Sequence, residues 1–217
     1  MDTQIARLNM VNRQIRTNGV RDPSVLAAML DVPRDVFLPK ALRGSAYLDE
    51  TLDLGGGRGL VEPLVLARLL QGAEVRPTDL ALVVGDATGY VTAVMARLTG
   101  FVVSIDCDAE WQKRAQASLQ DLGISNVELV SGPLDSGHQA KAPYDVVIFC
   151  GAVTEIPQEV CRQMADGGRL VAVVNDGCGI GQAVLVVRSG DTFGRRVLHD
   201  AAVPLLPTME QKPHFVL

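Results

Sequence analysis

Metal ligands, positive charge and long apolar runs are all scarce in this sequence. Its 217 residues include four cysteines and three histidines, without a Cys-x-x-Cys pair or a histidine at ligand spacing, which argues against a zinc site or a disulfide framework. A formal net charge of −5 disfavours nucleic acid as a partner. No apolar stretch is long enough to cross a bilayer, and the N-terminus lacks the apolar core of a signal peptide. We therefore expect a cytoplasmic protein without a metal or a membrane partner; no pattern predicts its oligomeric state.

The cysteines are interpreted as packing residues rather than as nucleophiles. Cys107 and Cys150 follow apolar stretches, where a free cysteine usually behaves as a small buried hydrophobe. With 47% hydrophobic and 21% charged residues, the chain can bury a sizeable core. We therefore predict a single domain over residues 1–217.

The segment around residues 81–106 holds the order of parts that a nucleotide cofactor requires. Leu80–Val84 is a short unbroken apolar run, as expected for a strand buried on both faces of a parallel sheet. Gly85 and Gly89 follow in a tight turn, and a helix over Tyr90–Leu98 would direct its free amides and positive dipole end at that turn. The pattern predicts that an electron-rich group lies there.

An acid follows the next strand of this segment. The apolar run Phe101–Ile105 ends at Asp106, about 20 residues beyond the glycine turn, where a carboxylate can accept both hydroxyls of a ribose. This spacing favours an adenosine-bearing ligand. Two structural alternatives stay open: the glycine pair can relieve a strand-to-helix corner, and Asp106 can be a solvated acid in an acidic stretch with Asp108 and Glu110.

Strands alternate with helices along most of the chain. The alternation predicts an α/β fold with a doubly wound, mostly parallel sheet, helices on both faces, and a ligand over the carboxyl ends of the strands. An antiparallel C-terminal hairpin is predicted from two runs around a turn-rich hexapeptide. Besides the elements named above, the predicted helices cover 5–18, 24–30, a stretch beginning at Pro63, 109–122 and 158–164, and the predicted strands 127–130, 144–150, 169–174, 182–188 and 195–202.

The segment Asp53–Pro63 has four glycines in eleven residues and is predicted to be a loop rather than a helix or a strand. Pro63 stands where it can begin the next helix.

Several stretches, in order along nearly the whole chain, resemble the protein-L-isoaspartate O-methyltransferases, class I enzymes that use S-adenosylmethionine. NGVRDPSVLAAMLDVPRDVFLP resembles the N-terminal helices of that family, AYLDETLDLGGGRGLVEP its substrate loop, and VVGDATGYVTAVMARL its first cofactor motif. APYDVVIFCGAVTEIP and MADGGRLVAVV resemble later sheet motifs, and AVPLLP the C-terminal strand. The N-terminal and loop stretches are not shared by methyltransferases at large, so they point to this family specifically.

The resemblance implies a seven-stranded, Rossmann-like methyltransferase sheet over residues 64–217, with capping helices and the substrate loop in residues 1–63. It also implies a set of cofactor-binding residues. Those predicted near the amino-acid end of S-adenosylmethionine are Gly85, Asp86, Ala87, Thr88 and Gly89; those near its ribose are Asp106 and Cys107; those near its adenine are Gly132, Pro133 and Leu134.

The implied substrate-binding residues are Gly55, Gly57, Arg58, Leu60 and Val61. The family typically reads Gly-x-Gly-Gln-Thr-Ile-Ser-Gln-Pro here, so Val61 occupies the place of the functional serine and no catalytic residue is predicted. Valine can neither donate nor accept a hydrogen bond. Arg58, in place of the glutamine, could grip a substrate carboxylate with two parallel bonds, or it could be a solvent-facing loop residue.

The function implied is transfer of a methyl group to the carboxylate of L-isoaspartyl residues in damaged proteins or peptides. In the family the ester closes to a succinimide that reopens partly to aspartate, which repairs the protein. An ionised carboxylate needs no general base. The departures from the family motifs at Val61, Val83, Ala87 and Pro133 leave two alternatives: a methyltransferase with another acceptor (a small molecule, a different protein carboxylate or tRNA), or a retired enzyme that keeps the fold.

Overall fold

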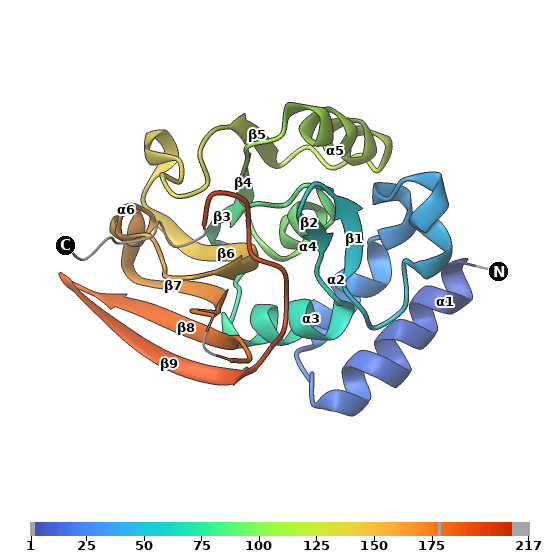
Figure 1. Ribbon diagram of the computed structural model, residues 1–217, viewed down its shortest axis with the longest axis horizontal. Helices are drawn as coiled ribbons and strands as arrows, with labels where there is room; N and C mark the ends of the chain where they lie inside the picture. The colour runs from blue at the N-terminus through green and yellow to red at the C-terminus, as the bar shows by residue number, and fades with distance from the viewer. Residues whose placement is uncertain (1–2, 178, 210–217) are drawn as a thin grey trace.

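The computed structural model describes residues 3–177 and 179–209 and is built around a seven-stranded sheet of order β5-β4-β3-β6-β7-β8-β9 (Figure 1). The strands from β5 to β7 run parallel, and β8 and β9 are antiparallel to their neighbours. This confirms the predicted mixed sheet and its C-terminal hairpin. The strands are β3 Leu80–Val84, β4 Phe101–Asp106, β5 Val127–Ser131, β6 Tyr144–Val153, β7 Met164–Val174, β8 Gln182–Ser189 and β9 Thr192–Asp200.

The central strands are apolar because both of their faces are covered. Alternate residues of β3 belong to two separate core clusters, Ala81 and Val83 to the first and Leu82 and Val84 to the second. The first cluster also contains residues of α2 (Pro23–Asp31), α3 (Pro63–Gly72), α4 (Tyr90–Leu98) and α5 (Ala109–Asp121). The second is covered by α6 (Gln158–Arg162), nearby loops and the segment after β9.

The N-terminal helix is longer and less regular than a single α-helix. α1 (Thr3–Asn9) continues into a π-helical turn over Met10–Ile15 and a 3-10 turn over Arg16–Asn18. Gly19 then ends it with φ of 88°, as its position after the apolar pattern predicts. Two further 3-10 turns, Arg34–Phe37 and Lys40–Ser45, lead from α2 toward the glycine-rich segment, and a third covers Gln139–Lys141.

The predicted loop over Asp53–Pro63 was wrong in part, because its ends pair as a small hairpin. β1 (Leu52–Gly55) and β2 (Arg58–Leu60) form a separate two-stranded antiparallel sheet. The glycines gather at the turn, where Gly55, Gly56 and Gly57 all have positive φ. Leu52 and Leu60 are buried, so burial at the ends of the hairpin compensates for its glycine-rich tip.

The segment after β9 crosses the carboxyl end of β6, and Figure 1 shows it in red between the β1–β2 hairpin and the central strands. The amide of Ala152 donates to the carbonyl of Pro204, and the amide of Leu206 donates to that of Ala152, each at 2.8 Å. This segment therefore covers the edge of the sheet where a ligand is expected. In residues 3–177 and 179–209, we find no helix with the length and apolar character that a membrane span requires.

Candidate active site

The glycine turn after β3 is shaped by the backbone and by side chains of the protein. Gly85 and Gly89 have φ of 80° and 85°, a region that residues with a Cβ rarely adopt. A Cβ on Gly85 would lie 2.7 Å from a methyl carbon of Leu206, and one on Gly89 would lie 2.7 Å from the Cβ of Ala115. Both positions therefore require glycine for conformation and packing, independently of a ligand.

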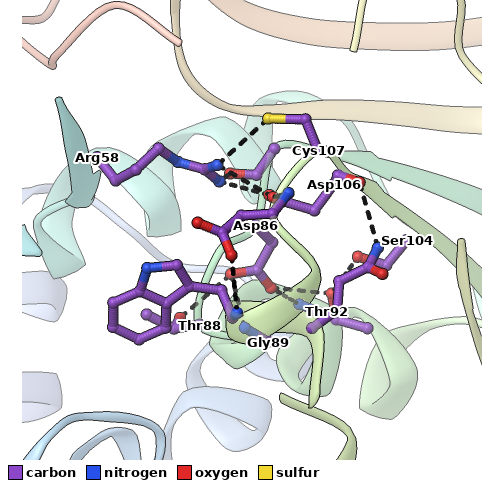
Figure 2. A network of polar contacts seen from close by, with 12 residues as sticks. Arg58, Asp86, Thr88, Gly89, Thr92, Ser104, Asp106 and Cys107 are labelled. Carbon is purple, nitrogen blue, oxygen red and sulfur yellow. Dashed lines mark hydrogen bonds and ion pairs between the residues drawn. The ribbon is translucent and has the colours of Figure 1, made fainter. Parts of the chain in front are cut away.

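Asp86 binds the first amides of α4 (Figure 2). Its Oδ1 accepts from the backbone N–H of Gly89 at 3.0 Å, and its Oδ2 accepts from the N–H and the hydroxyl of Thr92 at 2.7 and 2.9 Å. Burial raises the pKa of the Asp86 carboxyl, and the hydrogen bonds from Thr92 and Gly89 oppose that rise. The Asp86 carboxylate therefore already accepts from amides at this helix end, and the ligand predicted there stays a prediction. Ala87 and Thr88, between the two glycines, are both buried.

Asp106, at the end of β4, is held by Arg58 of the hairpin (Figure 2). Nη1 of Arg58 donates to Oδ1 at 3.0 Å while Nη2 pairs with Oδ2, so the two side chains form a two-pronged ion pair. Nη2 also donates to the carbonyl of Gly85 at 3.2 Å, and Nη1 lies 3.6 Å from Sγ of Cys107. Arg58 is 6% exposed and Asp106 1%. Neither residue is solvated, which excludes the solvent-facing alternatives for both.

The ion pair keeps the buried guanidinium charged. Burial alone would lower the pKa of Arg58. Its hydrogen bonds and its attraction to Asp106 together raise the pKa by more than burial lowers it, so the net shift is upward. Two elements that are far apart in sequence, β2 and the end of β4, are thereby joined through their side chains.

The cysteines near the crevice differ in exposure. Cys107 is exposed, so its interpretation as a buried packing residue was wrong. Cys150, within β6, is buried, and burial together with the nearby Asp86 and Asp106 holds the pKa of its thiol well above the ordinary 9.0. Cys161 is buried as well, whereas Cys178 lies outside the described residues.

The residues predicted for the adenine end lie beside Asp106, but not all of them face the crevice. The amide of Gly132 donates to the carbonyl of Asp106 at 3.1 Å, and a Cβ on Gly132 would come within 3.1 Å of Ile105. Pro133 is exposed. Leu134 is fully buried in the second core cluster, so its side chain packs in the interior rather than facing the crevice.

The residues predicted for substrate binding divide between the tip and the base of the hairpin. Gly55 and Gly57 lie at the tip, and a Cβ on either would meet nothing within 4 Å. Leu60 and Val61 at the base are 3% and 4% exposed and belong to the first core cluster. The Val61 side chain therefore packs in the interior at the place where the family has serine.

Arg34 is a buried residue next to the candidate site that the sequence patterns do not predict. It is fully buried, its Nη2 donates to the carbonyl of Val61 at 2.6 Å, and its guanidinium carbon lies 4.9 Å from the centroid of the Tyr90 ring. Burial lowers the pKa of Arg34, with Tyr90 and Asp86 acting against it. The only signal in the sequence is an arginine next to an aspartate between the apolar residues of VPRDVF.

The structure thus brings Arg58, Gly85 and Asp106 into direct contact, with Gly132 and Cys107 beside them. Within the part of the chain that the structure describes, no three His, Cys, Asp or Glu side chains gather as a metal site would require. The site therefore contains the two carboxylate oxygens of Asp106, the guanidinium of Arg58 and the backbone of the glycine turn, at the carboxyl ends of parallel strands.

Relatives of this chain were found in sequence and in structure. A protein-L-isoaspartate O-methyltransferase of Methanoculleus marisnigri is 39% identical over 168 residues, which are 77% of this chain and 76% of that protein. The enzyme of the same name from Koribacter versatilis is 34% identical over 95% of this chain and 93% of its own length.

Among solved structures, a protein-L-isoaspartate O-methyltransferase superposes with a TM-score of 0.80 at 25% identity, over 93% of this chain and 64% of that one. A Plasmodium falciparum chain assigned to the same family, solved with S-adenosyl-L-homocysteine, has a TM-score of 0.78 at 16% identity, over 95% of this chain and 98% of its own, and shares the fold. The sequence profile of the protein-L-isoaspartate(D-aspartate) O-methyltransferase family matches residues 6–209. The chain therefore belongs to this family.

Proposed function

We propose that the protein transfers the methyl group of S-adenosylmethionine to the free carboxylate of L-isoaspartyl residues in damaged proteins and peptides. The observation that carries this proposal is the extent of the family match, residues 6–209. It includes the N-terminal helices and the β1–β2 hairpin as well as the sheet, and those segments distinguish the family from methyltransferases at large.

The side chains at the crevice have the chemistry that an adenosyl cofactor needs. Asp106 offers two acceptor oxygens beside the glycine turn, which suits the two hydroxyls of a ribose. In this proposal the turn Gly85–Gly89 would hold the amino-acid end and the backbone of residues 132–134 would lie near the adenine. When bound, S-adenosylmethionine supplies a methyl group activated by a positively charged sulfur.

The protein has little covalent chemistry to perform, because the acceptor carboxylate is already ionised at neutral pH. Its contribution is to align the carboxylate oxygen with the methyl carbon and to exclude water while opposite charges are neutralised. The open tip of the hairpin, where no atom lies within 4 Å of a Cβ on Gly55 or Gly57, would let a peptide backbone approach closely. Arg58 can bind the acceptor carboxylate only when its guanidinium is released from Asp106.

Methylation of matched peptides tests the proposal. The protein is incubated with labelled S-adenosylmethionine and either an isoaspartyl peptide or its normal aspartyl twin. We expect label on the isoaspartyl peptide alone, as an ester that hydrolyses in mild base. Label on neither peptide, with cofactor binding measured by calorimetry, would show a different acceptor; absence of cofactor binding would favour the retired-enzyme alternative.

Restoring the serine at residue 61 tests the role of the missing hydroxyl. We expect Val61→Ser to raise kcat/KM for the isoaspartyl peptide by about tenfold, since a hydrogen bond to a charged group contributes roughly 1.5 kcal/mol or more. Val61→Ala is the matched control, because it removes the same buried methyl groups without adding a hydroxyl. Equal activities of the two variants would discard this explanation.

A further inference from the structure

The guanidinium of Arg58 lies on the carboxylate that the proposed cofactor needs for its ribose. Its two Nη groups face the two oxygens of Asp106 (Figure 2). Nη2 also donates to the carbonyl of Gly85 at 3.2 Å. Oδ1 additionally accepts from the backbone N–H of Asp108 at 2.9 Å. The Asp106 carboxylate therefore accepts hydrogen bonds from the guanidinium of Arg58 at both oxygens and from a backbone amide at Oδ1.

A ribose and this ion pair require the same edge of the carboxylate. The two hydroxyls of a ribose donate to a carboxylate at the end of this strand, and a guanidinium bound to both oxygens already fills the positions from which they would donate. The two arrangements therefore exclude each other. Because the pair is buried, water and salt weaken it less than a surface pair.

The hairpin that carries Arg58 is separate from the main sheet. In the described residues, 3–177 and 179–209, β1 and β2 pair with each other and not with the seven-stranded sheet, and two-stranded hairpins are marginally stable by themselves. The turn that precedes Arg58 consists of glycines whose Cβ positions are open. Release of Asp106 requires the Arg58 side chain to turn out of the crevice by a change at this glycine turn, while Leu60 stays buried in the core.

We propose that Arg58 occupies the ribose subsite as a competing side chain, so that S-adenosylmethionine binds Asp106 only when the guanidinium leaves it. This inference rests on the proposed function. It makes residue 58 a determinant of cofactor affinity in this chain, at a position where the family typically has glutamine, which carries no charge to pair with Asp106.

Calorimetric titration with S-adenosyl-L-homocysteine tests the inference without turnover. The full-length protein is compared with Arg58→Gln, which restores the family residue, and with Arg58→Met, which removes the charge and keeps an apolar stem. We expect both variants to bind at least about tenfold more tightly, because a close buried charge pair no longer has to be broken. Arg58→Lys, which keeps a charge but not the two-pronged geometry, should fall between them and the wild type.

A second background distinguishes competition at Asp106 from an unrelated effect of residue 58. In Asp106→Asn the carboxylate is absent, so adding Arg58→Met should give no gain in affinity. Circular dichroism identifies any variant that fails to fold, and the remaining pairs still decide the question. Affinities of Arg58→Gln and Arg58→Met within twofold of wild type, or weaker, would overturn the inference, as would an equal gain in the Asp106→Asn background.

The outcome is separable from that of the methylation test. Tighter binding by the variants with no label on either peptide would support the competing role of Arg58 and reject the isoaspartyl acceptor. Unchanged affinity together with normal isoaspartyl methylation would reject the competing role of Arg58 and support the isoaspartyl acceptor. Absence of binding by every variant would overturn both proposals.

Discussion

At the scale of single residues, two aspartates set the character of the crevice, and each has its own donors. Asp86 takes its hydrogen bonds from the start of α4, whereas Asp106 takes them from Arg58 and a backbone amide. One carboxylate therefore stabilises a helix, and the other is held by a side chain that can be displaced. Because Asp86 stabilises a helix and Asp106 pairs with Arg58, replacing each of them by alanine should have a different effect.

Replacing Asp86 should destabilise the fold. Asp86→Ala removes the acceptor of the Gly89 and Thr92 donors at a buried helix end, and unsatisfied buried donors each have a penalty of about 1–3 kcal/mol. We expect the free energy of unfolding in urea to fall by at least about 2 kcal/mol, since two buried backbone amides lose their acceptor. Asp135→Ala is the control, since Asp135 is exposed and should change stability by less than about 0.5 kcal/mol. Equal effects would show that Asp86 does not stabilise the helix.

The thiols should react in the order of their exposure. Cys107 is exposed at the crevice, whereas Cys150 is buried with a pKa held well above the ordinary 9.0. Only the thiolate is nucleophilic, so iodoacetamide at pH 8 should modify Cys107 in the folded protein and Cys150 only in denaturant. Peptide mass spectrometry measures both rates. Modification of Cys150 at a comparable rate in the folded protein would contradict the buried position.

At the scale of elements, the parallel strands were predictable from the sequence and the hairpin was not. β3 and α4 have the predicted bounds, because unbroken valine-rich runs and a glycine turn are local signals. In the hairpin the glycines outnumber the strand-forming residues, so the local pattern predicts a loop. Its pairing depends on the burial of Leu52 and Leu60 against distant parts of the chain, which no local pattern reveals.

The same distinction applies to the site. Asp106 could be identified from its place after a strand, but its partner Arg58 lies 48 residues earlier in the chain. A resemblance to family motifs can assign a role to each position separately. It does not show that two such positions contact each other, so it predicts Arg58 as a substrate-binding or solvent-facing residue and not as the partner of Asp106.

Substitution of a glycine at the hairpin tip should lower the stability of the protein, even though there is space for a side chain. Gly56 has φ of 61°, and a side chain in this left-handed region has a penalty of about 1–2 kcal/mol. We expect Gly56→Ala to lower the free energy of unfolding by about 1 kcal/mol. Gly44→Ala is the matched control, since Gly44 also has open space but no positive φ. A smaller effect at Gly56 than at Gly44 would mean that the turn does not limit stability.

At the scale of the whole molecule, we propose that residues 1–217 fold as one unit. The first core cluster includes residues from Met10 to Val203, so the N-terminal helices share their apolar contacts with the sheet. The single tryptophan, Trp111 on α5, reports on the region after β4, whereas circular dichroism reports on all helices. Both probes should give the same urea midpoint. An earlier transition by circular dichroism would show that the N-terminal segment unfolds separately.

The crossing segment after β9 has a consequence for biosynthesis. Pro204 and Leu206 bond to the end of β6, and Leu206 lies against the glycine turn, yet these residues are translated after every strand of the sheet. In a nascent chain the helices and central strands can therefore fold first, and the segment with Pro204 and Leu206 packs beside the glycine turn afterwards. A ligand that contacts this segment can therefore bind and stabilise the protein only after every strand of the sheet has been translated.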